Sequence, residues 1–352
     1  MNTIKLFAVF IFAGVSVNAQ WVKQSVNTTA SLRGLSVVIE KVVWASGTGG
    51  IFLRTLDGGK TWKVRSIPGA EKLDFRDVEA FDANTAYVLS IGNGESSRIY
   101  KTIDGGENWK LQFTNKNEKA FFDAIACWDK NNCIAMSDPV DGHYVLIETS
   151  DGGENWKPIV SNKMPAAKDG EAAFAASGTC LITHGKTGAF LVSGGSDARV
   201  FRSNDRGKTW TVSDTPMVKG TAGSGIFSIA MFDEKRGIIA GGNYEKPEAD
   251  KNNLAFTTDG GETWIAGHNP NGYRSGITYV TKMLIIDQLL VSVGSGGSDI
   301  SGDAGRTWLN LDKENYNAVQ SRGTNATWAV GANGLVARLN FKMNYQFKFK
   351  LR

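Results

Sequence analysis

The chain consists of short hydrophobic segments separated by glycine-rich and polar turns, and this pattern predicts β-strands. In the first repeat unit, four such segments span residues 35–38, 43–45, 51–54 and 62–65. Beyond the N-terminal region, no stretch keeps apolar residues at helical spacing. The 41 glycines and 7 prolines fit a chain with many tight turns. The pattern therefore predicts an all-β fold.

One eight-residue motif, [Ser/Thr]-x-Asp-x-Gly-x-[Thr/Asn]-Trp, occurs six times and sets the period of these strands. Successive motif aspartates are 44 to 54 residues apart, a spacing that fits one four-stranded blade of a β-propeller. The motif resembles the Asp-box, or BNR repeat, of β-propellers. Its aspartates are Asp57, Asp104, Asp151, Asp205, Asp259 and Asp303.

Each motif residue has a local mechanical role. The aspartate is expected to accept hydrogen bonds from the turn, and the glycine to take the positive φ of a tight hairpin. The tryptophan opens the next strand and can pack against a neighbouring blade. We therefore expect the six aspartates to serve the hairpins and not a reaction.

The two ends of the chain predict a seventh blade. Segments 315–320, 327–331 and 334–341 have the pattern of three strands, and no motif follows them. Segment 21–25 resembles the strand that follows each motif, so we expect it to be the outer strand that closes the ring and removes two sheet edges. The predicted fold is a seven-bladed β-propeller over residues 20–342, followed by a tail at 343–352.

The first nineteen residues predict export. Lys5 precedes an apolar run at 6–17, and Ala19 fits a cleavage site before Gln20. The run is too short to span a membrane comfortably, so stable membrane insertion is not expected. We interpret residues 1–19 as a signal peptide and place the mature protein in the periplasm or outside the cell. A net charge of +4 without long basic runs argues against nucleic acid as a partner.

Three cysteines are present, and export would permit a disulfide between two of them. Cys127 and Cys133 flank a turn between the first two strands of blade three. Whether they pair depends on the hairpin register, which the sequence leaves open. Cys180 lies in an apolar segment and is expected to be a buried thiol.

Long loops predict where a ligand would bind. Segments 161–170, 184–199, 215–224 and 243–253 carry the extra residues of blades four and five, and all are assigned to the face opposite the Asp-box hairpins. Loops on a rigid scaffold commonly carry function. Asp123 is one of the charged residues expected toward the central channel. Ligand-binding candidates on this face or in the channel are Arg76, Asp77, Asp138, His143, Glu171, Tyr244, Tyr273, Arg274, Asp299 and Arg322. Turn formation and ion pairing between blades are the structural alternatives for the same residues.

Enzyme activity is the alternative to simple binding for these residues. Sialidases and other glycoside hydrolases share the Asp-box, but the sialidase element Phe-Arg-Ile-Pro is absent. A glycosidase with two carboxylates stays open, with Asp138, Asp141 and Glu171 as its candidates. No nucleotide-binding fingerprint or Cys-x-x-Cys motif is present, and three histidines do not suggest a metal site. No cofactor or metal is expected.

A longer element around the motif identifies a closer resemblance. A glycine-rich turn, a short strand and a basic residue precede the motif, as at Arg54, Lys101 and Arg202, and Arg338 ends a similar strand. This element is similar to that of the photosystem II stability and assembly factor-like propellers, as are segments 138–144, 170–178 and 224–228. The resemblance implies a non-catalytic protein whose arginine-bearing face holds a client protein.

The expected function follows from these points. We expect an exported, monomeric, non-enzymatic propeller that binds a protein or peptide on the face opposite the Asp boxes. The alternative is a secreted glycoside hydrolase or carbohydrate-binding propeller that uses acidic residues at the channel mouth, with a glycan as its ligand.

Overall fold

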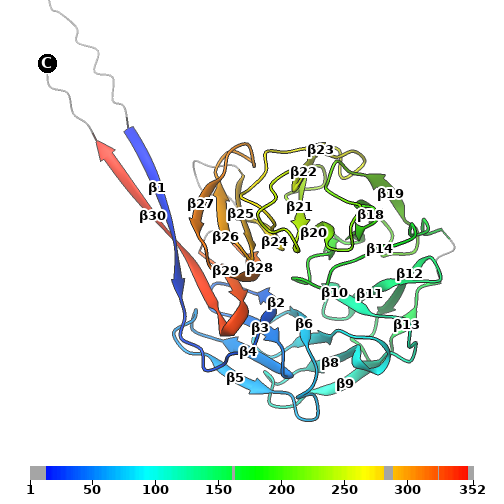
Figure 1. The fold of residues 1–352 in the computed structure, drawn as a ribbon. Helices are drawn as coiled ribbons and strands as arrows, with labels where there is room; N and C mark the ends of the chain where they lie inside the picture. Colours follow the sequence, from blue (N-terminus) through cyan, green and yellow to red (C-terminus); the bar gives the residue numbers. More distant parts are fainter. Residues whose placement is uncertain (1–12, 161–162, 281–287, 324, 348–352) are drawn as a thin grey trace, which may run out of the picture.

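Seven antiparallel sheets surround a central axis in the computed structural model, which describes residues 13–160, 163–280, 288–323 and 325–347 (Figure 1). This arrangement confirms the predicted seven-bladed β-propeller. Two short 3₁₀ helices, η1 (Gly94–Ser96) and η2 (Ala332–Gly334), are the helical elements of the described residues. Within those residues, no helix is long and apolar enough to cross a membrane.

The first three blades follow one another along the chain, each with four strands ordered from the axis outward. Their strands are β2 (Leu32–Val37), β3 (Val43–Gly47), β4 (Ile51–Thr55) and β5 (Lys63–Ser66); β6 (Phe75–Ala80), β7 (Ala86–Ser90), β8 (Arg98–Thr102) and β9 (Lys110–Thr114); and β10 (Phe122–Asp129), β11 (Asn132–Val140), β12 (His143–Thr149) and β13 (Lys157–Pro158).

Blades four to six repeat this order with one elaboration. Their strands are β15 (Leu181–His184), β16 (Gly188–Val192), β18 (Arg199–Ser203) and β19 (Thr211–Asp214); β20 (Ser224–Met231), β21 (Gly237–Asn243), β22 (Leu254–Thr257) and β23 (Ile265–Ala266); and β24 (Gly276–Val280), β25 (Leu289–Gly294), β26 (Gly297–Ser301) and β27 (Leu309–Asp312). Two short strands, β14 (Glu171–Ala172) and β17 (Gly194–Gly195), extend the inner edge of blade five. The crossing from blade three to blade four is therefore anchored on blade five.

The seventh blade joins the two ends of the chain. It contains β28 (Tyr316–Ser321), β29 (Thr327–Gly331), β30 (Val336–Phe347) and β1 (Ala13–Lys23), with β1 outermost. The ladder places Trp21 opposite Leu339, so an N-terminal strand closes the ring as predicted. Because β1 supplies the fourth strand of blade seven from the other end of the chain, this pairing completes the ring.

Both strands of this closure are longer than predicted. The ladder continues outward to the pair Ala13 and Phe347, and Figure 1 shows the two strands as a ribbon that leaves the ring. Residues 13–19 of the expected signal peptide and 343–347 of the expected tail thus form strand, while 1–12 and 348–352 lie outside the described residues. The alternation of Met343, Tyr345 and Phe347 with polar residues is a strand pattern that continues past the predicted boundary.

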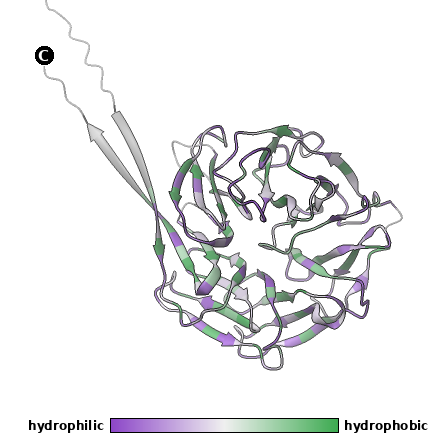
Figure 2. Cartoon of the chain, viewed as in Figure 1, coloured by the Kyte–Doolittle hydropathy of each residue, from purple (hydrophilic) through white to green (hydrophobic). Residues whose placement is uncertain are grey.

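The core lies between neighbouring sheets, and Figure 2 shows hydrophobic residues concentrated along the strands of the ring. Motif tryptophans form part of these contacts. The Trp62 ring lies 5.6 Å from Trp328 of blade seven, and Trp156 lies 6.4 Å from Tyr87 of blade two. Each tryptophan thus packs against the preceding blade, as the sequence predicted.

The Asp-box hairpins are held by the hydrogen bonds expected of them. In the first box, Asp57 accepts hydrogen bonds from the backbone N–H of Thr61 at 2.9 Å and from its hydroxyl at 2.7 Å. Thr55 Oγ1 accepts the N–H of Gly59, whose φ is +91°. The other five boxes repeat both the N–H bond to Asp Oδ1 and the glycine bond.

The basic residues that precede the motif bind the next blade. Lys101 Nζ donates to the carbonyl of Gly152 at 2.6 Å, and Arg202 Nη1 donates to that of Gly260 at 3.1 Å. Arg338 reaches the Gly58 carbonyl across the closure, at 3.3 Å. These three contacts connect a strand to the Asp box of the following blade, which explains why a basic residue recurs at this position of the repeat.

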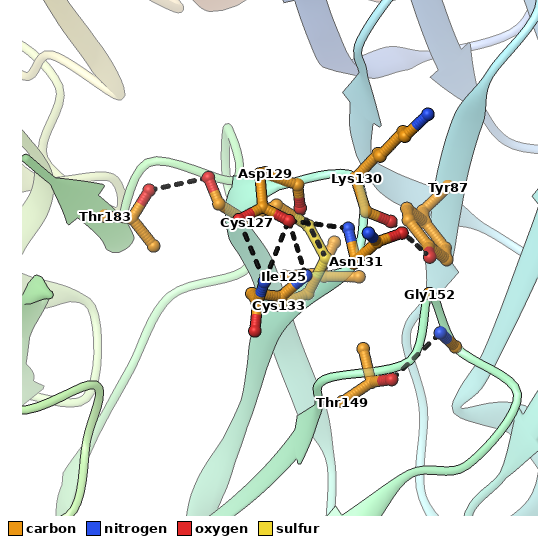
Figure 3. The surroundings of a disulfide bond; sticks show 12 residues. Tyr87, Ile125, Cys127, Asp129, Lys130, Asn131, Cys133, Thr149, Gly152 and Thr183 are labelled. Atoms are coloured by element: carbon orange, nitrogen blue, oxygen red, sulfur yellow. Dashed lines mark hydrogen bonds between the residues drawn. A yellow bond between two sulfur atoms is a disulfide. The ribbon is translucent and has the colours of Figure 1, made fainter. Parts of the chain in front are cut away.

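Cys127 and Cys133 form a disulfide at the β10–β11 turn (Figure 3). Neighbouring blades hold the same turn from both sides. Tyr87 Oη donates to the carbonyl of Lys130 at 3.1 Å, and Thr183 Oγ1 donates to that of Cys127 at 2.8 Å. The turn therefore links blades two, three and four on the Asp-box face, and Cys180 is buried as a free thiol.

Candidate ligand-binding pocket

A cavity of about 540 Å³ opens at the centre of the face opposite the Asp boxes. We call it the mouth pocket. Its walls come from the starts of inner strands, the crossings between blades and the loops between second and third strands. Its lining residues are Ser31, Arg33, Arg76, Phe121, Asp123, Asp138, Ala173, Phe174, Ala175, Ala176, Phe227, Tyr244, Tyr273, Ser275, Ser295, Asn315, Tyr316, Asn317 and Ala332.

β-Bulges direct side chains into this pocket. In five blades the pairing of the innermost strand skips one residue close to its start, and the skipped residue lines the pocket. These residues are Arg33, Arg76, Asp123, Phe227 and Asn317. A bulge bends the strand and re-aims the side chain of the extra residue. The repeated fold thus supplies a ring of variable positions around one axis.

Blades one and two contribute two arginines. Arg33 Nη1 donates to the carbonyl of Ala176 at 3.2 Å, and Arg76 Nη1 donates to that of Ala175 at 3.3 Å. Arg76 also pairs with Asp74 at 2.8 Å. Burial, and then the nearby charge of Arg76, lower the pKa of Arg33. The two guanidinium groups therefore provide donors for an acidic group or a peptide carbonyl.

Blade three contributes two carboxyl groups. Asp123 is 1% exposed, and Asp138 Oδ1 accepts the backbone N–H of Ala173 at 2.7 Å. Burial, and then the charge of Asp138, raise the pKa of Asp123 well above its usual value. Burial also raises the pKa of Asp138 to about 6. The two residues are thus a neighbouring acidic pair in a region of low dielectric.

Blades four to six contribute an aromatic wall. Phe174 and Phe227 stack with their centroids 3.9 Å apart, and Tyr244 meets both rings edge-on. Tyr273 packs edge-on against Phe227 at 4.8 Å. Tyr244 is 49% exposed, so its ring is available to a ligand. The pocket is divided into basic, acidic and aromatic sectors.

The structure brings four of the ten ligand-binding candidates to the mouth pocket: Arg76, Asp138, Tyr244 and Tyr273. His143 lies at the exposed start of β12, outside the pocket lining. Asp77 is buried beneath the pocket, where its carboxylate accepts the N–H groups of Val78 and Ile125. Burial raises the pKa of Asp77 to about 7.

Two charged candidates pair with each other inside the protein. Arg274 and Asp299 are both 0% exposed, and Arg274 Nε donates to Asp299 at 2.8 Å. Asn271 Nδ2 also donates to Asp299, at 2.7 Å. The sequence could not distinguish this buried pair from two surface charges, because both lie next to glycine-rich loops. Neither side chain lines the mouth pocket.

Arg322 and part of one loop were assigned to the wrong face. Arg322 follows β28 in the turn to β29, on the same face as the Asp boxes, and its N–H donates to the carbonyl of Ala326. Residues 184–187 likewise form the β15–β16 turn on that face. Of the loop 161–170, residues 161–162 lie outside the described part. Both errors have the same cause. These residues follow the ends of inner strands and not their starts, and the two ends of a strand lie on opposite faces of the ring.

The three hydrolase candidates do not meet in one site. Asp138 lines the mouth pocket, whereas Asp141 is exposed and pairs with Lys119 at 3.1 Å. Glu171 is buried, where its carboxylate accepts a hydrogen bond from Arg199 Nε at 3.0 Å. These three carboxyl groups therefore do not form the pair of acid and base that a glycosidase needs in one site.

Sequence reasoning did not select Arg33, Phe174 or Phe227 for the pocket. A signal was present for two of them: each pocket residue of a bulge follows a large buried apolar residue at or near the start of an inner strand, as in Leu32-Arg33 and Ile226-Phe227. Recognising it required the bulge register, which depends on the partner strand. Among the described residues, no group of three or more His, Cys, Asp or Glu side chains is placed to hold a metal ion.

The fold and the six repeats define the class of protein, a BNR-repeat β-propeller. The chain resembles the photosystem II assembly factor-like family within this class: the family model described as "Photosynthesis system II assembly factor YCF48" matches residues 13–116, which contain β1 and the first two blades. No curated protein matches the chain.

Two solved structures share the whole fold. The structure "YCF48 bound to D1 peptide" is 16% identical with a TM-score of 0.63, and the match covers 91% of this chain and 96% of that one. The structure "YCF48 from Cyanidioschyzon merolae" is 18% identical with a TM-score of 0.60, and covers 91% of this chain and 98% of that one. Identities at this level show a common architecture.

Proposed function

We propose that this protein is an exported, non-catalytic propeller that binds a peptide segment of a partner protein in the mouth pocket. The observation that carries the proposal is the pocket itself. Its volume of about 540 Å³ falls within the ~300–1,000 Å³ common for ligand sites, and its basic, acidic and aromatic sectors suit a chain of mixed side chains. Its location opposite the Asp boxes matches the usual use of loops on a rigid scaffold.

Two further points support a peptide ligand. One propeller of the same fold has been solved bound to a peptide. The apolar part of the pocket is a wall of rings beside hydrogen-bond donors, an arrangement that recurs in sites for peptide side chains and backbone. Export is proposed from the pattern of residues 1–19 and is testable by determining the N-terminus of the secreted protein.

The proposal is tested with residues 20–352 immobilised and a random heptapeptide library passed over them. Enriched peptides are then measured by fluorescence anisotropy against two pocket variants, Tyr244→Ala and Arg76→Gln. Because both side chains face the pocket, we expect each variant to weaken binding at least tenfold, about 1.4 kcal/mol.

Two variants on the opposite face serve as controls. Ile103→Ala removes an apolar side chain that is 72% exposed, and Arg322→Gln removes an exposed arginine. Both lie on the Asp-box side and should bind like the parent protein. Failure to enrich any peptide, or weaker binding only in the controls, would remove the proposal.

A further inference from the structure

Asp123 is a buried carboxyl group with one oxygen atom unpartnered within the part of the chain that the structure describes, although the backbone N–H groups of Asp138 and Ala175 face the carboxyl group. It is 1% exposed and its Oδ2 atom has no hydrogen-bond partner among the described residues, yet the residue lines the mouth pocket. An unpaired carboxyl group in such a position is unfavourable, because burial removes the water that would solvate it. The bulge at the start of β10 places Asp123 in the lining of the pocket.

The groups around Asp123 leave part of its charge uncompensated. Asp138 of β11, Tyr144 of β12 and the Cys180 thiol lie near Asp123. Asp77 of β6 faces the same thiol. Arg76 is the positive group that faces Asp123, but its Nε is already bonded to Asp74. The acidic sector therefore contains two carboxyl groups beside one guanidinium group, and that group also pairs with Asp74.

From this arrangement we infer that Asp123 and Asp138 form a subsite for a cationic group, the ammonium or guanidinium of a basic side chain in the bound peptide. The inference rests on the proposed function, because it names one feature of the ligand that the pocket would select. A cation would provide the missing partner for Asp123 Oδ2 and would compensate two neighbouring carboxylates at once. The aromatic wall would then hold an apolar part of the same peptide.

Binding of a cation must be linked to protons. Two buried neighbouring carboxyl groups cannot both ionise easily, so the pair retains a proton into the neutral range when the pocket is empty. When an ammonium group binds, both groups ionise and the proton passes to the solvent. Binding of a lysine peptide should therefore strengthen between about pH 5 and pH 8, while the ammonium group itself stays charged.

The test uses three pools of fluorescein-labelled heptapeptides, acetylated and amidated at their ends, with lysine, norleucine or glutamate fixed at the centre and random residues elsewhere. Norleucine has nearly the size of lysine and no charge. We expect the lysine pool to reach half-saturation at a concentration at least tenfold below the norleucine pool at pH 8, and the difference to shrink toward pH 5.

Three variants locate the effect. Asp123→Asn and Asp138→Asn should each abolish the preference for lysine and retain binding of the norleucine pool. Asp141→Asn, which changes an exposed carboxylate three residues from Asp138, should leave the preference intact. Thermal unfolding of each variant checks that it is folded, and removal of a buried charge is not expected to unfold the protein.

The outcomes separate this inference from the proposed function. Equal binding of all three pools by the parent protein overturns the cationic subsite and leaves peptide binding standing. A lysine preference that survives in Asp123→Asn and Asp138→Asn, or is lost equally in Asp141→Asn, also overturns it. Absence of binding by every pool removes both proposals together.

Discussion

At the scale of single residues, burial decides what each charged side chain does. Arg76 and Arg274 both come from loops or strand starts on the pocket face. Arg76 lines the pocket, whereas Arg274 is buried in an ion pair with Asp299. A buried ion pair contributes little net stability, yet loss of one partner leaves an uncompensated charge in the interior. Charge reversal at Arg274 would therefore report on folding and not on partner binding.

We expect Arg274→Met to lower the free energy of unfolding by about 3–5 kcal/mol, because Asp299 would stay buried without its counter-ion. Arg322→Met makes the same chemical change at an exposed turn and should alter stability by less than about 0.5 kcal/mol. Urea unfolding followed by tryptophan fluorescence measures both. Equal stability of the two variants would show that the Arg274–Asp299 pair is not buried as described.

At the scale of elements, neighbouring blades are connected through their turns as well as through the packed faces of their sheets. The β10–β11 turn carries the disulfide and is held by Tyr87 from blade two and by Thr183 from blade four. Arg206 from the fourth Asp box adds a hydrogen bond to Asn132 at 2.9 Å. A covalent link in this turn restricts the unfolded chain and keeps the turn in the shape that its neighbours contact.

The double variant Cys127→Ala/Cys133→Ala should be less stable than the parent protein by about 2 kcal/mol, since a native disulfide commonly contributes 2–4 kcal/mol. The measurement is a urea unfolding midpoint with and without dithiothreitol. Reductant should shift the midpoint of the parent protein and leave the double variant unchanged. A parent protein insensitive to reductant, with three free thiols by titration of the unfolded chain, would mean that the bridge does not form in solution.

At the scale of the whole molecule, the ring depends on an N-terminal strand that is far from its partner in sequence. Trp21 is mostly buried, donates from Nε1 to Ser298 Oγ at 2.8 Å and packs its ring 5.4 Å from Tyr316. It therefore joins blade seven to blade six, just as the motif tryptophans join other neighbouring blades. Of the segment before Gln20, Ala19 packs against the same hydrophobic cluster as Trp21, and residues 13–18 continue the ladder with 342–347.

Two truncations distinguish these parts of β1. A chain that begins at Gln20 retains Trp21 and should fold with a single unfolding transition. A chain that begins at Gln24 lacks the closing strand and should lose at least the ~3–5 kcal/mol expected for removing a buried tryptophan, with an open sheet edge that favours aggregation. Calorimetry and size-exclusion chromatography measure both. Similar unfolding temperatures for the two chains would contradict closure by β1.

The sequence by itself determined the repeated parts of this protein. Six boxes, each with an aspartate, a glycine and a tryptophan at fixed spacing, specify local hairpins, and local hydrogen bonds such as that from Thr61 to Asp57 depend on neighbours in the chain. The apolar pattern at both ends was also sufficient to predict that Trp21 would complete the last blade. The sequence predicted the hairpins because their physical causes act over a few residues and the motif occurs six times.

Only the tertiary structure decided which side chains form the mouth pocket. Arg33, Asp123 and Phe227 come from three blades and meet because a bulge in each inner strand turns the side chain toward the axis. The same folding buries Arg274 with Asp299 and places Arg322 on the opposite face. Bulge register, burial and the choice of face all depend on partner strands distant in sequence, so no local pattern of residues specifies them.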